Sequence, residues 1–192
     1  PESSTMGELK SRPQKVLASR TSGASCRMDL SVSEEGTEML DLILFEPEIP
    51  PNTGNIIRLC ANTGFTLHLV GRLGFTLSDA KLRRAGLDYH EWAAIRQHAG
   101  LPECLESLGQ PRLFALSTRG TALYTQARFR AGDALLFGPE QRGLPAELLA
   151  GVASDRCLRI PMRSGSRSLN LSNAAAIIAY EAWRQLEFAG AG

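Results

Sequence analysis

The chain lacks the short motifs that mark several common kinds of site. It has no G-x-x-x-x-G-K-[ST] sequence, which excludes a P-loop nucleotide site, and no G-x-S-x-G elbow of serine hydrolases. The first strand-like run leads into EPEIPPNTGN rather than G-x-G-x-x-G, so we expect no dinucleotide site there. The three histidines offer no obvious catalytic triad, and we interpret each of them as structural.

Cysteine is sparse, and its spacing indicates neither a disulfide framework nor a metal centre. The four cysteines lie far apart, with no C-x-x-C and no histidine at metal-ligand spacing. We therefore expect reduced thiols, with Cys60 buried on a helix, and no bound metal. No apolar run is long enough for a membrane span, and no signal peptide is recognisable. These absences predict a cytoplasmic protein without membrane contact.

Charge of either sign is not in excess. The 21 Lys and Arg residues against 20 Asp and Glu give a net charge of +1, which by itself does not indicate a nucleic-acid partner. Arginines are nevertheless clustered locally, and such clusters can contact phosphate, although most are simply solvated surface. The clustered arginines are Arg83, Arg84, Arg128, Arg130, Arg156, Arg159, Arg163 and Arg167.

Residues 1–38 differ in composition from the rest. They contain no aromatic residue, show no sustained periodicity, and are rich in Ser, Thr and charge, so they have little apolar surface to offset the entropy of ordering. We interpret them as a disordered leader or an added extension, the alternative being a native arm that packs on the body or on a partner. Residues 39–192 then form a single domain, with 43% hydrophobic residues in the whole chain.

From Met39 onward, strand-like and helix-like segments alternate. We expect strands at residues 39–45, 65–70, 92–97 (the weakest pattern), 112–118, 134–138 and 157–162. We expect helices at residues 52–64, 77–86, 101–108, 145–151 and 173–188, with Gly64 and Gly86 as C-terminal stops. Apolar strands without polar alternation, separated by helices, predict an α/β fold with a parallel sheet flanked by helices on both faces.

Polar, glycine-rich loops follow the last three longer strands. They are LSTRGT, FGPEQRGLP and IPMRSGSRSLNLSN. Open parallel sheets bind ligands beyond the carboxyl ends of their strands, and loops with accessible backbone groups suit an adenine and a ribose. Gly138 and Gly143 would let the backbone approach a ligand closely. The alternative is a plain turn before a helix that begins with Pro145, but that leaves Glu140 and Arg142 unexplained.

Four segments together resemble one family. NTGNIIRLCANTGF, LRRAGLDYHEW, FGPEQRGLP and IPMRSGSRSLNLSNAAAIIAYEAWRQL, in this order within residues 39–188, are similar to the SPOUT class of RNA methyltransferases, and most closely to its TrmL-type members. The resemblance implies a C-terminal trefoil knot, S-adenosylmethionine as methyl donor with S-adenosylhomocysteine as product, and a homodimer with the active site near the subunit interface. It also implies methylation of the ribose 2′-hydroxyl of the anticodon wobble nucleotide, cytidine or modified uridine, with leucine tRNAs as the expected substrates.

The same resemblance assigns roles to particular residues. The expected catalytic residues are Arg58, Asn55, Glu140 and Asn173, and the expected cofactor-binding residues are Leu116, Gly138, Ile160 and Ser168. Arg58 is expected to assist loss of the hydroxyl proton; since an arginine pKa exceeds 12, a charge-assisted contact that activates the hydroxyl is easier than action as a free base. Because the sulfonium methyl is already activated, the reaction needs no metal.

Three further expectations concern the RNA, the dimer and the last helix. Phosphates of the anticodon region would be held by Arg83, Arg84, Arg163 and Arg167. Tyr180 is either a dimer or substrate contact or a buried side chain. Ser168 or Asn170 would cap the last helix. Two alternatives stay open: the same chemistry on another RNA site, and a non-catalytic RNA-binding knot protein.

Overall fold

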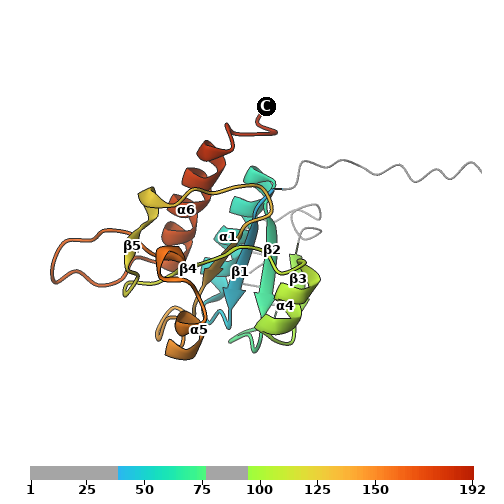
Figure 1. The fold of residues 1–192 in the computed structure, drawn as a ribbon. Coiled ribbons are helices and arrows are strands. Elements are labelled where there is room, and N and C mark those ends of the chain that lie inside the picture. The colour runs from blue at the N-terminus through green and yellow to red at the C-terminus, as the bar shows by residue number, and fades with distance from the viewer. Residues whose placement is uncertain (1–38, 77–94) are drawn as a thin grey trace, which may run out of the picture. The chain divides into compact units, whose positions relative to one another are not determined.

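The computed structural model describes residues 39–76 and 95–192, and within them seven strands form one parallel sheet (Figure 1). The strand order is β3-β2-β1-β6-β4-β7-β5. The strands are β1 (Asp41–Phe45), β2 (Thr66–Val70), β3 (Ile95–His98), β4 (Leu113–Leu116), β5 (Ala122–Leu123), β6 (Ala134–Phe137) and β7 (Cys157–Arg159). The α-helices are α1 (Pro50–Thr63), α4 (Leu101–Ser107), α5 (Ala146–Ala150) and α6 (Leu171–Gln185), with 3-10 turns at Tyr124–Gln126 and Ser154–Arg156.

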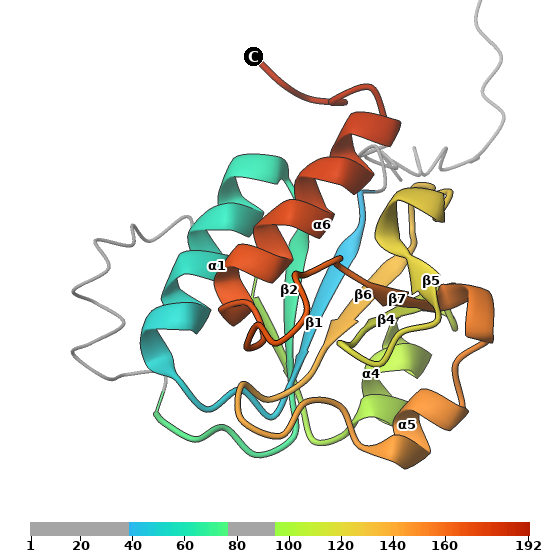
Figure 2. The ribbon, with the colours of Figure 1, turned by 90° about the vertical axis from the view of Figure 1, so that its left-hand side faces the viewer.

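Helices cover both faces of the sheet, as the sequence predicted (Figure 2). Successive strand side chains point to opposite faces, so Leu42 packs with α1 and α6, while its neighbour Ile43 packs with α4 and α5. Both residues are fully buried. The continuous apolar character of the central strands therefore follows from burial on both faces.

Six strand predictions are confirmed, and β5 was missed because two residues carry no periodic pattern. His98 is the last residue of β3, three residues before the start of α4. Cys60 is buried on α1, as expected, and desolvation raises the pKa of its thiol to about 12. The helix expected at 77–86 and the leader at 1–38 lie outside the described residues.

Both helices that flank the cavity start earlier than expected. Helix α1 begins at Pro50, where the missing N–H of proline costs nothing, and ends at Gly64, whose φ of 72° is left-handed. Helix α6 begins at Leu171 because the side chain of Asn170 accepts hydrogen bonds from the backbone N–H groups of Ser172 and Asn173. The cap of α6 is thus Asn170 and not Ser168, and Asn173 lies in the first turn as expected.

Within the described parts of the chain, no helix is long and apolar enough to cross a lipid bilayer. The trefoil knot stays a prediction from the family resemblance.

Candidate functional site

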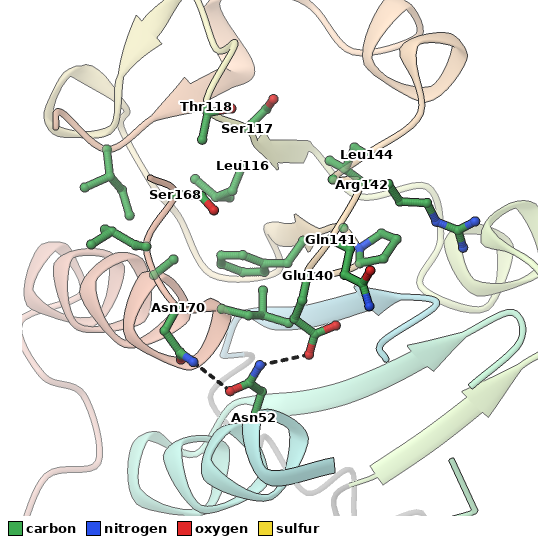
Figure 3. A pocket seen from close by; sticks show the side chains of 18 of the residues that line it. Asn52, Leu116, Ser117, Thr118, Glu140, Gln141, Arg142, Leu144, Ser168 and Asn170 are labelled. Carbon is green, nitrogen blue, oxygen red and sulfur yellow. Dashed lines mark hydrogen bonds between the residues drawn. The ribbon is translucent and has the colours of Figure 1, made fainter. Parts of the chain in front are cut away.

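A cavity of about 510 Å³ lies beyond the carboxyl ends of β4, β6 and β7 (Figure 3). Its walls come from the three loops singled out in the sequence and from the start of α1. This is the position at which open parallel sheets place their ligands, and the volume is that of a small-molecule site.

The inner wall of the cavity is apolar, and its rim is polar. Its apolar side chains include Leu116, Phe137, Leu158, Ile160 and Leu171. Polar residues on the rim are Asn52, Ser117, Thr118, Glu140, Ser168 and Asn170. Such a wall accommodates a flat ring, and the rim can fix polar groups at its edge.

The structure brings five of the predicted site residues together. The lining includes all four expected cofactor-binding positions and one expected catalytic position: Leu116, Gly138, Ile160, Ser168 and Glu140. They come from three separate loops, so only the fold assembles them. Their roles toward a ligand stay predictions.

The Glu140 carboxylate ties the loop after β6 to the start of α1. Oε2 accepts the backbone N–H of Glu48 at 2.8 Å, and Oε1 accepts the N–H of Ile49 at 3.2 Å and the side-chain amide of Asn52 at 3.0 Å. A negative charge at a helix N-terminus is also favoured by the helix dipole. Through these three hydrogen bonds, Glu140 holds the loop after β6 against the start of α1.

Asn52 and Asn170 extend this chain of hydrogen bonds across the cavity rim (Figure 3). Asn170 Nδ2 donates to Asn52 Oδ1 at 2.9 Å, while its own Oδ1 caps α6. Glu140, Asn52 and Asn170 therefore connect the loop after β6, the start of α1 and the start of α6. Only 5% of Asn52 is exposed, which is low for an asparagine in the first turn of a helix.

Sequence reasoning missed Asn52. It interpreted NTGN as a helix opening and selected Asn55 instead. Because α1 starts at Pro50, Asn52 is inside the helix and its side chain is not used as a cap. The only signal for Asn52 and Asn170 in the sequence was their position. Asn52 lies six residues before Arg58, and Asn170 lies directly before the apolar run of α6.

Three predicted catalytic residues lie outside the cavity lining. Asn55 and Arg58 are exposed on the side of α1 that faces away from the sheet, and Asn173 is exposed on α6. Within this single chain, the structure thus separates Arg58 from the cavity, although α1 and α6 pack side by side on the same face of the sheet (Figure 2).

Gly138 is required by the path of the chain itself. A Cβ atom there would lie 2.4 Å from the backbone N of Leu144 and 2.6 Å from the carbonyl carbon of Gly143, a clash that backbone atoms cannot relieve. The loop after β6 therefore folds tightly back on itself. Gly143 has a φ of 67°, so it too is explained by local backbone conformation. The expected closeness of these glycines to a ligand is not needed to account for them.

Two arginines contribute positive charge to the lining. Arg142 forms ion pairs with Glu46 and Glu48 on the outer side of the rim. Arg119 donates from its guanidinium to the Leu144 carbonyl at 3.2 Å, and no acidic partner of Arg119 is found among the described residues. Arg119 is therefore the better placed of the two to meet an anionic group of a ligand.

The structure describes some of the residues expected to contact RNA or a second copy of the chain. Arg163 and Arg167 are exposed on the loop between β7 and α6. Tyr180 is 46% exposed and packs edge-on against Trp183, so the buried alternative is wrong. Arg83 and Arg84 lie outside the described residues.

Comparison with known sequences identifies close relatives. A tRNA (cytidine(34)-2′-O)-methyltransferase of Photorhabdus asymbiotica is 57% identical over 158 residues, covering 80% of this chain and 98% of the relative. A protein of the same name from Escherichia coli (strain K12) is 55% identical over 153 residues, again covering 80% and 98%.

Comparison with solved structures also finds methyltransferases. One described as "Structural insights into the 2-OH methylation of C/U34 on tRNA" has a TM-score of 0.73 and 52% identity, covering 79% of this chain and 99% of that one. The SpoU methyltransferase AviRb from Streptomyces viridochromogenes, solved with AdoMet, has a TM-score of 0.70 and 25% identity, covering 79% and 62%. Residues 39–180 match the SpoU rRNA Methylase family. With relatives this similar along almost their whole length, the chain belongs to the SpoU rRNA Methylase family.

Proposed function

We propose that this chain transfers a methyl group from S-adenosylmethionine to the ribose 2′-hydroxyl of the wobble nucleotide, position 34, of tRNA, with leucine tRNAs as substrates. The observation that carries the proposal is the 55–57% identity over 98% of relatives named for this reaction. The cavity at the carboxyl ends of β4, β6 and β7 supports it independently, because it unites the residues expected to bind the cofactor.

The donor set of the cavity fits S-adenosylmethionine. Leu116, Phe137 and Ile160 offer apolar surface for the adenine, and the hydroxyl of Ser168 and the backbone around Gly138 offer polar contacts at its edge. Arg119 would meet the carboxylate of the methionine part. When bound, S-adenosylmethionine supplies a methyl group that is already activated by its sulfonium.

The chain itself has two tasks, which are placement and proton loss. Glu140, Asn52 and Asn170 hold three loops in one arrangement, and such orientation of reactants can lower a barrier by roughly 7–11 kcal/mol. Arg58 would contact the ribose hydroxyl or the adjacent phosphate and stabilise the developing alkoxide.

A homodimer would bring Arg58 to a cavity. The outward stripes of α1 and α6 carry Asn55 and Arg58 together with Ile177 and Tyr180, which are 37% and 46% exposed. Neighbouring exposed apolar side chains suit contact with another protein surface. If two subunits pair through this layer, Arg58 of one can reach the cavity of the other. The exposed Arg163 and Arg167 would bind tRNA phosphates, in the cytoplasm where tRNA is processed.

The test is methyl transfer to leucine tRNA that lacks the wobble methyl group. The full chain would be incubated with tRNA and S-adenosylmethionine, and the tRNA digested and analysed by mass spectrometry. We expect a 2′-O-methyl group at nucleotide 34, lost in Arg58→Ala and kept in the matched control Arg130→Ala, which removes an exposed arginine that does not line the cavity. Cofactor binding without a mark on any tRNA would refute the proposed substrate; a mark that persists in Arg58→Ala would refute only the role of Arg58.

A further inference from the structure

His68, His98 and Cys104 converge on the opposite side of the sheet from α1 and α6. His68 is in β2, His98 ends β3, and Cys104 is on α4, which packs over these strands. One donor atom from each lies within 4.8 Å of the other two. None of the three lines the cavity described above.

Asp41 fixes the orientation of His68. His68 Nε2 lies 3.0 Å from Asp41 Oδ1 and His68 Nδ1 lies 2.9 Å from His98 Nε2. Since a carboxylate only accepts, Nε2 carries the proton and Nδ1 presents a lone pair toward His98. A histidine whose second nitrogen donates to a carboxylate is the arrangement found repeatedly around zinc ligands.

The hydrogen bonds account for the two histidines, and the Cys104 sulfur, packed in the apolar core, lies within 4.8 Å of a ring nitrogen of each. His68 is 3% exposed and Cys104 is fully buried, so both positions are fixed by the core. His98 is half-buried, which leaves a side of the cluster open to solvent. Zinc prefers imidazole and thiolate ligands, whereas magnesium and calcium prefer oxygen ligands.

The spacing is near that of a tetrahedral site. With Zn–N at about 2.0–2.1 Å and Zn–S at about 2.3 Å, two nitrogens are separated by about 3.3 Å and a nitrogen and sulfur by about 3.6 Å. The two histidine nitrogens, at 2.9 Å, would move apart by a few tenths of an ångström. The sulfur, which lies within 4.8 Å of a nitrogen of each histidine, would approach each nitrogen by about 1.2 Å at most.

We infer that His68 Nδ1, His98 Nε2 and Cys104 Sγ form a binding site for a divalent zinc-like ion, with Asp41 orienting His68 and solvent as the fourth ligand. His98 then carries its proton on Nδ1 instead of Nε2, and the Cys104 thiol releases its proton to solvent as the metal–sulfur bond forms. No local sequence pattern indicates this site, because its three ligands come from three different elements.

The surroundings shift the pKa values of His98 and Cys104 in opposite directions. Burial and the neighbouring His68 lower the pKa of His98, against a smaller opposite effect of Glu103. Burial, then Asp41 and Glu103, raises the pKa of the Cys104 thiol to about 11.

The test uses the metal-free full chain titrated with Zn²⁺ against a chromophoric chelator, and with Co²⁺ to detect the thiolate charge-transfer absorption. We expect one ion per chain, a higher unfolding temperature with Zn²⁺, and a Co²⁺–thiolate band. His98→Gln and Cys104→Ala should each weaken Zn²⁺ binding at least about tenfold. Cys157→Ala removes another buried cysteine and should leave binding unchanged.

Three results would overturn the inference. They are no Zn²⁺ binding by the unaltered chain, equal affinity in His98→Gln and the unaltered chain, and a Co²⁺–thiolate band that survives Cys104→Ala. His98 is half-buried at the end of an edge strand, so His98→Gln should disturb folding less than Cys104→Ala. Circular dichroism of each variant verifies the fold.

Discussion

Replacing Glu140 by Gln tests whether the carboxylate organises the cavity. Glutamine has nearly the same shape, but it presents one oxygen and one NH₂ group where Glu140 presents two oxygens. One oxygen can still accept from Ile49 N and Asn52 Nδ2, whereas the NH₂ group would face the N–H of Glu48, now 2.8 Å from Oε2. The substitution therefore removes the charge-assisted hydrogen bond from the N–H of Glu48. In its place, two N–H donors face each other.

The expected loss of stability follows from that bond. A hydrogen bond to a charged group contributes about 1.5–3 kcal/mol, and partial exposure of Glu140 lets water replace some of it, so we expect about 1–2 kcal/mol. For a chain of this length each kcal/mol lowers the melting temperature by about 2–4 °C, which gives a decrease of roughly 2–8 °C. Affinity for S-adenosylmethionine should fall as well, because the loop after β6 lines the cavity.

Thermal unfolding followed by circular dichroism measures the first effect, and isothermal titration calorimetry the second. Glu106→Gln is the matched control, because it removes an exposed carboxylate from the last turn of α4, away from the cavity. If Glu140→Gln unfolded at the same temperature and bound S-adenosylmethionine as tightly as the unaltered chain, the organising role of Glu140 would be refuted.

Four further predictions concern single residues. Arg58→Ala should reduce kcat for methyl transfer by about 10²-fold or more while calorimetry finds cofactor affinity unchanged; a change in affinity alone would contradict its assignment to the substrate. Asn170→Ala should lower the free energy of unfolding by about 1 kcal/mol in urea titrations, since α6 loses its cap, and an unchanged midpoint would show that the cap is dispensable. Arg119→Ala should weaken S-adenosylmethionine binding, with partial recovery in Arg119→Lys, and equal affinities in all three proteins would exclude the proposed carboxylate contact. Cys60, with its pKa raised to about 12, should resist alkylation at mildly alkaline pH in the folded protein and react after unfolding, as peptide mass spectrometry can measure; rapid reaction in the folded state would mean that α1 opens.

The architecture was predictable because burial on both faces leaves a simple trace in the sequence. Apolar runs such as 39–45 and 134–138 became the central strands, with helices where 3.6-residue periodicity was present. Strand β5 has two residues and was not predictable from any pattern, and the start of α1 was misjudged because Asn52 resembles a cap. Strand order and the side of the sheet covered by each helix came only from the structure.

The cavity was predictable in outline, and its internal bonding was not. Loop composition located the site correctly at the ends of β4, β6 and β7. Glu140 and Asn52 are 88 residues apart, and Asn52 and Asn170 are 118 apart, so no local pattern could pair them. The assignment of Asn55 and Asn173 came from motif matching along the chain, whereas the structure brings Asn52 and Asn170 together at the rim. The cluster of His68, His98 and Cys104 escaped notice for the same reason, since its members meet only through sheet pairing.

The most direct test of the proposed reaction is to compare two leucine tRNAs that differ by one oxygen atom. One carries a ribose at nucleotide 34 and the other a 2′-deoxyribose at that nucleotide, with every other position identical. The full chain and labelled S-adenosylmethionine should transfer one methyl group to the first tRNA and none to the second. Equal transfer to both would place the methyl group on another atom and contradict ribose 2′-O-methylation at the wobble position.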